Sequence, residues 1–345
     1  MIVLCNVSSL AVTRIEKLAK LLVSNRAQGF YLERLDLLEV PSSREAHAIA
    51  DYFGLPLPLH VLCTHANDLR HTKSVICHLW TSPIPPESIV YLANSVYACI
   101  PEFSFVQLCC GSDRENRLML GSELAAKYAV NPKGRKGLIT RPPLVTPKSI
   151  EAFASQIPQA PGTARALEVV PYIGRNARSP KENELWLIFR LPRTLGGRSI
   201  SSIEMDRKIE LNAQARKLAK RSCLYSDLFF LLSGTDFEYD ADDNHLTKEA
   251  NESDKRRANA LRIVDIDLIT MTNGQLHDWQ SFDIIARQME EREGRIFRTT
   301  SEATRARQKA LWERLILGVR SSGKTEVVRM SLTDRMARAS AIDSY

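Results

Sequence analysis

The sequence lacks the long apolar runs that mark membrane-spanning helices. Runs such as Leu185–Phe189 and Leu228–Leu232 are far shorter than the ~18 residues that such a helix requires. A basic leader is also missing, since the first positive charge is Arg14, and this argues against a cleaved signal peptide. The seven cysteines have no repeating spacing, which favours reduced thiols over a disulfide framework. These absences predict a cytoplasmic protein without a membrane segment.

Internal repeats and low-complexity tracts are absent as well, and the composition excludes disorder, collagen and coiled-coil arrays for the bulk of the chain. The 345 residues are 44% hydrophobic and 25% charged, which is ordinary for a globular protein. A chain of this length predicts about two domains. The 47 basic and 40 acidic residues give a net charge of +7, which suits a polyanionic partner such as DNA.

The charge is unevenly distributed along the chain. Residues 236–254 contain eight acids and one lysine, a net charge of −7, whereas residues 292–345 contain twelve basic residues and six acids, a net charge of +6. Eight acids so close together require either full hydration or a bound cation. The acidic segment is therefore either a solvated loop or part of a cation site.

The first half of the chain is predicted to have an α+β fold. Apolar spacing indicates helices over 12–26 and 43–53, and residues 55–80 have the pattern of short strands joined by polar turns. A short helix over 150–157 follows a proline-rich and glycine-rich stretch, and we expect the domain boundary near Pro161-Gly162. The predicted division is therefore a domain over 1–160, a second over 163–292 and a basic helical tail over 293–345.

The second half alternates helices with short strands. Ser179 as N-cap, Pro180 at the first helical position and Glu182 at the third predict a helix that runs to Phe189. Two short strands, DLFFLL and DFEYD, come next, and then a charged helix over 248–262, a strand over 264–271 and a helix over 281–290. This order is typical of an α/β layered domain.

The two short strands bring several acids together. Alternation in DFEYD places Glu238 and Asp240 on one face of the strand. A two-residue loop at Ser233-Gly234 would set Asp227 opposite Asp240 and Phe229 opposite Glu238, so that three carboxylates share a face. Their mutual repulsion favours a hard divalent cation such as Mg²⁺. A loop of odd length would turn Asp227 to the other face.

Residues 223–262 resemble the very-short-patch-repair-type branch of the PD-(D/E)xK, restriction-endonuclease-like superfamily. That branch reads D-[LF]-x-[FW], then hhhEYDG (h being hydrophobic), then H, then D-x-x-R-x-x-x-L. The residues that fall on this pattern are Asp227, Glu238, Tyr239, Asp240, His245, Asp254, Arg257 and Leu261. The segment SPKE at 179–182 matches the S-P-x-E that opens such domains. Upstream, RPPLVTPKSIEAF, LPLHVL and IPEFSFVQL resemble the AbiE-type antitoxin-like domain that is often fused to it in bacteria.

The resemblance implies an α+β antitoxin-like, DNA-associated domain followed by an α/β restriction-endonuclease-like domain with a mixed central sheet flanked by helices. Its implied activity is Mg²⁺-dependent (or Mn²⁺-dependent) hydrolysis of DNA phosphodiester bonds, in bacterial defence or DNA processing. Asp227 and Glu238 would ligate the metal, and Glu182 would complete or orient the site. His245 is the implied proton-transfer residue. The residues implied to contact phosphate are Lys255, Arg256 and Arg257.

The chain also departs from the pattern of that branch. Asp240 stands where the superfamily usually has the lysine that polarises the attacking water, and this leaves the general base open. Ala241 replaces a glycine, and Asn244 replaces the first of two paired histidines. The alternative function is therefore a catalytically silent DNA-binding or antitoxin-like regulator that retains the fold. Besides DNA, the resemblance allows two partners, a second copy of the chain and a toxin or other defence-system protein.

Several of these residues also have purely structural interpretations. Glu182 can be a capping-box glutamate, worth ~1 kcal/mol to its helix. Asp254 and Arg257 can form a helix-surface pair worth ~0.3 kcal/mol. His245 can be a solvated loop residue. Asp227 and Glu238 are harder to explain in this way, because acids within apolar strands need a partner.

Two further patterns resemble a zinc site and a nucleotide-binding loop, but the spacing of the first and the expected secondary structure around the second argue against both. Six histidines and cysteines lie within residues 60–78, but without the C-x-x-C or H-x₃-H spacing of zinc sites. The segment GVRSSGKT at 318–325 matches the phosphate-binding loop, G-x₄-G-K-[ST]. A helix over 301–317, ended by Gly318, is expected where that motif needs a strand. Nucleotide binding would require a permuted arrangement with Asp265 as the acid.

Overall fold

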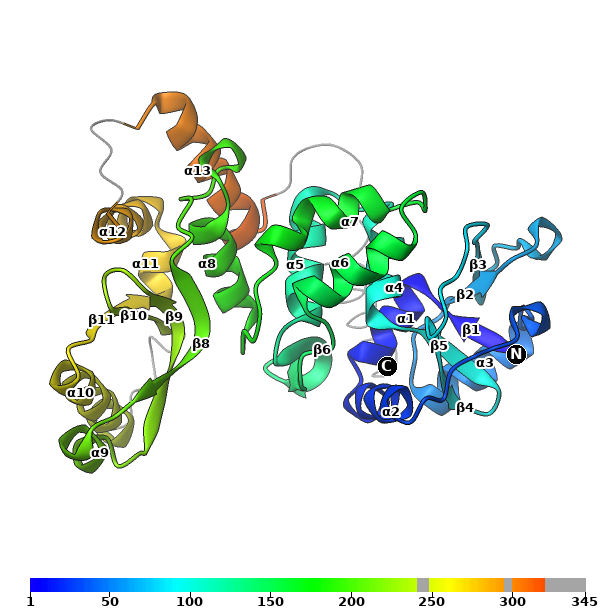
Figure 1. The fold of residues 1–345 in the computed structure, drawn as a ribbon, viewed down its shortest axis with the longest axis horizontal. Helices are drawn as coiled ribbons and strands as arrows, with labels where there is room; N and C mark the ends of the chain where they lie inside the picture. The colour runs from blue at the N-terminus through cyan, green and yellow to red at the C-terminus, as the bar shows by residue number, and fades with distance from the viewer. Residues whose placement is uncertain (241–247, 295–299, 320–345) are drawn as a thin grey trace, which may run out of the picture. The chain divides into compact units, whose positions relative to one another are not determined.

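The structure is a computed structural model that describes residues 1–240, 248–294 and 300–319 (Figure 1). These residues form two compact units, divided between Ile173 and Gly174, which are called unit 1 and unit 2 below. The expected boundary at Pro161-Gly162 lies within unit 1. The chain is a mixed α/β protein whose sheets are flanked by helices, in line with the coarse part of the expected fold class.

Unit 1 alternates strands and helices along the chain. Its elements are β1 (Ile2–Leu4), α1 (Asn6–Thr13), α2 (Glu16–Ala27), α3 (Ser43–Phe53), β2 (Leu59–Cys63), β3 (Val75–Leu79), β4 (Ile89–Ala93), β5 (Val96–Cys99), α4 (Pro101–Cys109), α5 (Arg114–Leu124), β6 (Tyr128–Arg135), β7 (Leu138–Thr140), α6 (Pro147–Gln156) and α7 (Thr163–Val169). Five strands form one mixed sheet in the order β3-β2-β1-β5-β4, and β6 pairs with β7 separately. Val3 and Leu4 on the central strand are fully buried, so the core of unit 1 lies against this sheet.

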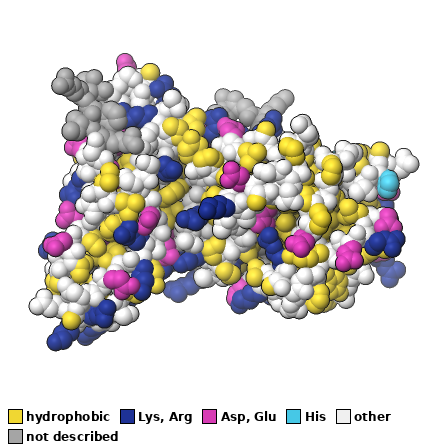
Figure 2. Space-filling model, viewed as in Figure 1, with side chains coloured by type: hydrophobic (Ala, Val, Ile, Leu, Met, Phe, Trp, Pro, Cys, Tyr) yellow, Lys and Arg dark blue, Asp and Glu magenta, His cyan; other side chains and the backbone are white. Residues whose placement is uncertain are grey.

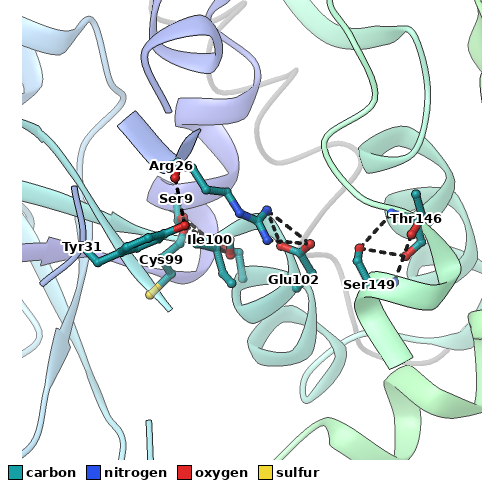
Figure 3. Close-up of polar contacts among 9 residues, drawn as sticks. Ser9, Arg26, Tyr31, Cys99, Ile100, Glu102, Thr146 and Ser149 are labelled. Carbon is teal, nitrogen blue, oxygen red and sulfur yellow. Dashed lines mark hydrogen bonds and ion pairs between the residues drawn. The ribbon is translucent and has the colours of Figure 1, made fainter. Parts of the chain in front are cut away.

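Polar contacts join the helices of unit 1 to its sheet and to one another (Figure 3). Ser9 on α1 donates a hydrogen bond to the carbonyl oxygen of Cys99 at 2.8 Å. Arg26 on α2 forms an ion pair with Glu102 on α4 at 3.0 Å, and the Glu102 side chain is only 2% exposed. These contacts pair each buried polar group, as a stable interior requires.

Gly162, from the expected interdomain boundary, is packed inside unit 1. Its φ is +93°, and a Cβ atom there would lie 2.0 Å from the carbonyl oxygen of Val106. Gly162→Ala should therefore destabilise unit 1 by about 2 kcal/mol or more, as measured by urea unfolding followed by circular dichroism. Gly54, with φ +70° and nothing within 4 Å of a Cβ, is the matched control, and Gly54→Ala should cost only about 1 kcal/mol. Equal losses would contradict the role of this close approach.

Unit 2 is built on a four-stranded mixed sheet in the order β11-β10-β9-β8. Strands β8, β9 and β10 are antiparallel, and β11 runs parallel to β10. The elements of unit 2 are α8 (Pro180–Arg190), β8 (Ile203–Glu210), α9 (Ala213–Ala219), β9 (Cys223–Phe230), β10 (Thr235–Asp240), α10 (Lys248–Ile263), β11 (Asp267–Thr272), α11 (Asn273–His277), α12 (Trp279–Arg292) and α13 (Glu302–Ile316). Because β10 and β11 are parallel, α10 lies in the crossover that joins them.

Aromatic and aliphatic clusters connect the sheet of unit 2 to its helices. Phe189 on α8 packs edge-on against Phe230 on β9 and Phe237 on β10, with ring centroids 5.1 and 5.4 Å apart. A second cluster joins Phe229 on β9 to Ala260 and Leu261 on α10. Helix α10 is thus fixed on the sheet by its C-terminal half.

A buried ionic network holds α12 against the segment that follows α8. Arg198, whose side chain is 1% exposed, donates to Asp283 at 2.7 Å and to Glu290 at 3.1 Å. The two acids are 3% and 4% exposed, so both charges are removed from water. Arg193 also contacts Glu290, and Arg305 on α13 contacts Asp283. This network fixes the positions of both C-terminal helices.

The expected strand register of the acidic hairpin was wrong by two residues. The observed pairs place Phe230 opposite Thr235 and Leu228 opposite Phe237. The turn therefore contains four residues, 231–234, instead of two. It includes Leu231 and Leu232, which are exposed although the sequence pattern assigned them to the strand. A shift of two residues preserves the alternation of faces, so Asp227 moves from the level of Asp240 to that of Glu238.

Most of the expected helices are present. The predicted helices over 43–53, 150–157, 179–189, 248–262, 281–290 and 301–317 correspond to α3, α6, α8, α10, α12 and α13. The single helix expected over 12–26 was wrong, because the chain forms α1 and α2 with an extended residue, Ile15, between them. Arg14 at this break forms a bidentate ion pair with Glu123, a partner that local sequence does not reveal.

Candidate functional site

Glu182 lies in the first turn of α8 and is 6% exposed. The Ser179 side chain caps the helix by accepting a hydrogen bond from the Glu182 amide at 3.2 Å. In return, the Glu182 carboxylate accepts hydrogen bonds from the Ser179 hydroxyl at 2.9 Å and from the Arg178 amide at 2.8 Å. A capping box, the structural interpretation of Glu182, would require a bond from the Ser179 amide to this carboxylate, but the carboxylate accepts from the Arg178 amide and the Ser179 hydroxyl instead. These two bonds hold the carboxylate in a fixed position.

Asp227 and Glu238 meet where the ladder between β9 and β10 ends. The Asp227 amide donates to Glu238 Oε1 at 3.4 Å, and the Tyr239 amide donates to Asp227 Oδ2 at 3.1 Å. Side-chain oxygens thus accept the hydrogen bonds of strand amides at this level. The hairpin brings the two acids together as the sequence predicted, although the register differs.

Asp236 and Arg257 lie beside Asp227 and Glu238, a contact that the sequence pattern did not predict. Asp236 on β10 is fully buried, and Arg257 Nη2 lies 2.9 Å from its Oδ2. The same nitrogen contacts Glu238 and the carbonyl oxygen of Tyr225, the latter at 2.7 Å. Asp236 is two residues before Glu238 on β10 and therefore lies on the same face of the strand, and this spacing could have identified it. The helix-surface pair expected between Arg257 and Asp254 was wrong, because the guanidinium reaches the strands instead.

The four carboxylates of this cluster repel one another. Burial and the charge of Asp227 raise the pKa of Glu182 to about 7. Burial, Asp227 and Asp236 raise the pKa of Glu238 to about 9, and burial also raises the pKa of both aspartates. Arg257 opposes these shifts for the three strand acids, but it is one positive charge beside four carboxyl groups. We call this set, Glu182, Asp227, Asp236 and Glu238, the carboxylate cluster.

Arg178 and Asp206 lie beside the carboxylate cluster. The Arg178 guanidinium stacks over the ring of Tyr225, 4.9 Å from its centroid, and pairs with Asp206 at 2.6 Å. Asp206, whose side chain is 5% exposed, has a φ of +53° within β8, a conformation that few residues other than glycine adopt. Counting this pair, five carboxylates face two guanidinium groups. The surroundings of the site therefore retain an excess of negative charge.

Removing the charge of Glu182 should change how stability depends on pH. Because its pKa rises from 4.5 to about 7 on folding, the folded state binds this proton more tightly than the unfolded chain does. The free energy of unfolding should therefore fall as pH rises from 4.5 to 7, by on the order of 3 kcal/mol from this group. Glu182→Gln retains an amide oxygen as acceptor and should flatten this dependence in urea unfolding measured in EDTA. Parallel pH profiles for the two proteins would contradict the pKa shift.

Basic residues surround the same end of unit 2. Lys255 on α10 is exposed, and Arg256 pairs with Glu252 on the same helix. Figure 2 shows lysine and arginine side chains on the part of unit 2 that carries α9 and α10. The exposed residues on α9 and in the turn after it, here called the α9 basic patch, are Arg216, Lys217, Lys220 and Arg221. This patch precedes β9 directly, and β9 continues through Tyr225 to Asp227.

Comparisons with known proteins do not indicate a function for this chain. No family model, curated protein or solved structure matches it. An assignment of function therefore depends on the chemistry of the carboxylate cluster and its surroundings. Among the described residues, no helix is both long enough and apolar enough to cross a bilayer.

The structure describes one of the two remaining catalytic candidates, Asp240. Asp240 ends β10 and pairs in the ladder with Thr272 on β11. His245, the implied proton-transfer residue, lies outside the described residues, as do Ala241 and Asn244. The position of Asp240 beyond Glu238 on the same strand is therefore the only part of this prediction that the described chain places.

In the histidine and cysteine segment of unit 1 the cysteines lie in the core, whereas His65 and His71 are exposed. His60 and His78 are hydrogen-bonded ring to ring at 2.8 Å, and Cys63 and Cys77 are buried. Burial raises the pKa of Cys63 to about 11, which keeps it a neutral thiol. Within the described part of the chain, no three His, Cys, Asp or Glu side chains are arranged to hold a metal ion.

The nucleotide-binding motif begins directly after a helix. Helix α13 ends at Ile316, and Gly318 follows with a φ of +69°, as expected for a glycine that ends a helix. Residues 320–325 of the motif lie outside the described residues. Asp265, the acid of the permuted alternative, occupies an exposed turn with a φ of +57°. The described part of this segment thus has the helical context that the sequence predicted.

Proposed function

We propose that this chain binds DNA and that its unit 2 hydrolyses phosphodiester bonds with the help of a divalent metal ion, Mg²⁺ or Mn²⁺. The observation that carries the proposal is the carboxylate cluster, in which a helix and two strands gather acids from positions 182 to 238. Buried acids with uncompensated charge are unfavourable in a purely structural role. A mixed sheet flanked by helices is also what the resemblance to restriction-endonuclease-like domains implies.

The chemistry of the cluster fits a hard dication. Its donors are carboxylate oxygens, which Mg²⁺ and Mn²⁺ prefer, and its negative charge exceeds the positive charge nearby. Asp227 and Glu238 would hold the metal, and Glu182 would complete or orient the site. When bound, the metal would activate a water molecule and stabilise charge on the scissile phosphate. In the observed arrangement the described side chains form no metal-ligand set, and Arg257 contacts two of the acids.

The residues of the chain itself supply proton transfer and phosphate binding. The pKa of Glu182, about 7, lets its carboxyl group exchange a proton near neutral pH, as a general acid or base must. The α9 basic patch, together with Lys255 and Arg256, offers positive charge for the DNA backbone. Phosphate contacts of this kind weaken steeply as salt increases. We assign unit 1 a DNA-associated, antitoxin-like role on the resemblance alone, with a toxin or other defence-system protein as its partner.

A second candidate function is DNA binding without cleavage. The contacts of Arg257 favour it, because the guanidinium already neutralises part of the charge that a metal would neutralise. A silent relative of a nuclease could use the same basic surface to bind DNA and leave the phosphodiester bonds intact.

Incubation of supercoiled plasmid with the full chain separates the two candidates. Nicking or linearisation that requires Mg²⁺ or Mn²⁺ and is lost on Glu238→Ala would support the nuclease. DNA retention in gel-shift assays without cleavage in either metal would favour the silent binder and contradict our proposal. Cleavage that survives Glu238→Ala would exclude the carboxylate cluster as its source.

A further inference from the structure

Arg257 is the one basic side chain that contacts the carboxylate cluster directly among the described hydrogen bonds and ion pairs. Helix α10 carries it, and the next turn of this helix is anchored in the core by Ala260 and Leu261. The guanidinium therefore projects from a fixed base toward Asp236 and Glu238. Its side chain is 21% exposed, which leaves it a path to solvent.

Arg257 shares a single nitrogen among its acceptors, unlike Arg198 in the buried ionic network. Arg198 uses two nitrogens, Nη1 and Nη2, for its two acids, whereas Arg257 directs Nη2 alone at three oxygens. That nitrogen carries two protons, so one of the three acceptors always lacks a full hydrogen bond. Asp236 Oδ1 is buried and has no hydrogen-bond partner. Arg257 Nε and Ser226 Oγ are also buried without a partner, so the guanidinium leaves polar atoms of the site unpaired and one oxygen of Asp236 open to another cation.

A divalent metal ion and the guanidinium compete for the same oxygens. A metal bound to Glu238 cannot share that carboxylate with Arg257 without strong repulsion between the two cations. A released guanidinium requires another anion, and a phosphodiester is the acceptor that arginine binds best in bidentate geometry. The DNA backbone, attracted by the α9 basic patch, would provide that acceptor.

We infer that Arg257 is an exchangeable counter-ion of the carboxylate cluster, displaced by the divalent metal and then bound to the phosphate of DNA. This inference rests on the proposed function and adds a coupling to it. Because the metal and DNA both favour the released position of Arg257, each strengthens the binding of the other. A purely structural ion pair would give no such coupling.

Calorimetric titration of Mn²⁺ into the full chain tests the competition. Arg257→Gln should tighten Mn²⁺ binding by about tenfold, since it removes the competing charge. Arg262→Gln, which removes an exposed charge further along the same helix, should change the Kd by less than about twofold. A loss of a merely structural arginine would weaken metal binding, so an unchanged or higher Kd in folded Arg257→Gln overturns the inference.

The coupling between metal and DNA binding is also measurable in the wild-type chain, so this test does not depend on the folding of a variant. Titration of Mn²⁺ in the presence of a short phosphorothioate duplex should give a Kd about fivefold lower or more than titration without it. In Arg257→Gln this difference should disappear. Equal Kd values with and without the duplex in the wild type would overturn the inference.

The outcomes also separate this inference from the proposed function. Mn²⁺ binding that is lost on Glu238→Gln but insensitive to Arg257 and to DNA retains the nuclease proposal and removes the counter-ion role. Mn²⁺ binding that is absent, or unaffected by Glu238→Gln, removes both.

Discussion

Glu238→Gln should reduce metal-dependent cleavage of plasmid DNA by at least about 100-fold. The substitution retains the shape of the side chain and its oxygen for the Asp227 amide, but it removes the carboxyl group that would lose its proton to bind the metal. A carboxamide is a poor ligand for a dication compared with a carboxylate, because it contributes no charge. The rate of supercoiled plasmid loss in excess Mg²⁺ is the measurement.

A matched control for this prediction is available on β8. Glu204 is 51% exposed and pairs only with Arg207 three residues away on the same strand in the described ion pairs. Glu204→Gln removes the same charge from the surface and should leave the rate unchanged within about twofold. Comparable losses in both variants would mean that general electrostatics, and not the cluster, governs cleavage.

Arg198→Met should destabilise unit 2 by about 3–5 kcal/mol. The substitution leaves Asp283 and Glu290 buried. Their remaining partners all lie in more exposed positions than Arg198; these are Arg193, Arg287 and Arg305. A buried charge that loses its partner retains the full cost of leaving water, whereas the lost ion pair no longer offsets it.

Urea unfolding followed by tryptophan fluorescence is a direct measurement of this loss. Trp279 and Trp312 pack against each other on α12 and α13, with ring centroids 5.5 Å apart, so they report on the region that the network holds. Lys208→Met is the control, since its 53% exposed side chain pairs with Glu210 at the surface and should contribute about 0.5 kcal/mol or less. A loss below about 1 kcal/mol for Arg198→Met would contradict the structural role of the network.

Local rules account for the helices that the sequence predicted correctly. Helix α8 begins at a serine cap followed by proline and glutamate, and α3 ends at Gly54 with a left-handed conformation, so each boundary is encoded within a few residues. The break between α1 and α2 was missed because its partner, Glu123, lies far away in sequence. Such a break depends on tertiary contacts and not on propensity.

The sequence predicted two of the acids that form the site, but not the strand register that sets their relative positions. Alternation and spacing identified Asp227 and Glu238, because period two assigns side chains to faces. The register could not be obtained in this way, since a shift of two residues satisfies the same alternation. Local pairing rules also missed the partners of Arg257, because they consider only neighbours on one helix, whereas a long side chain reaches another strand.

The crossover position of α10 has a consequence for how the charge of the cluster can be altered. Each residue of an α-helix turns the next by about 100° around the axis. A single-residue insertion between Arg257 and Ala260 would therefore rotate the guanidinium away from the strands while the anchoring turn stayed in the core. One added residue in this helix would thus remove the positive charge of Arg257 from the carboxylate cluster. The cluster would then require a bound cation, although every acidic residue stays in place.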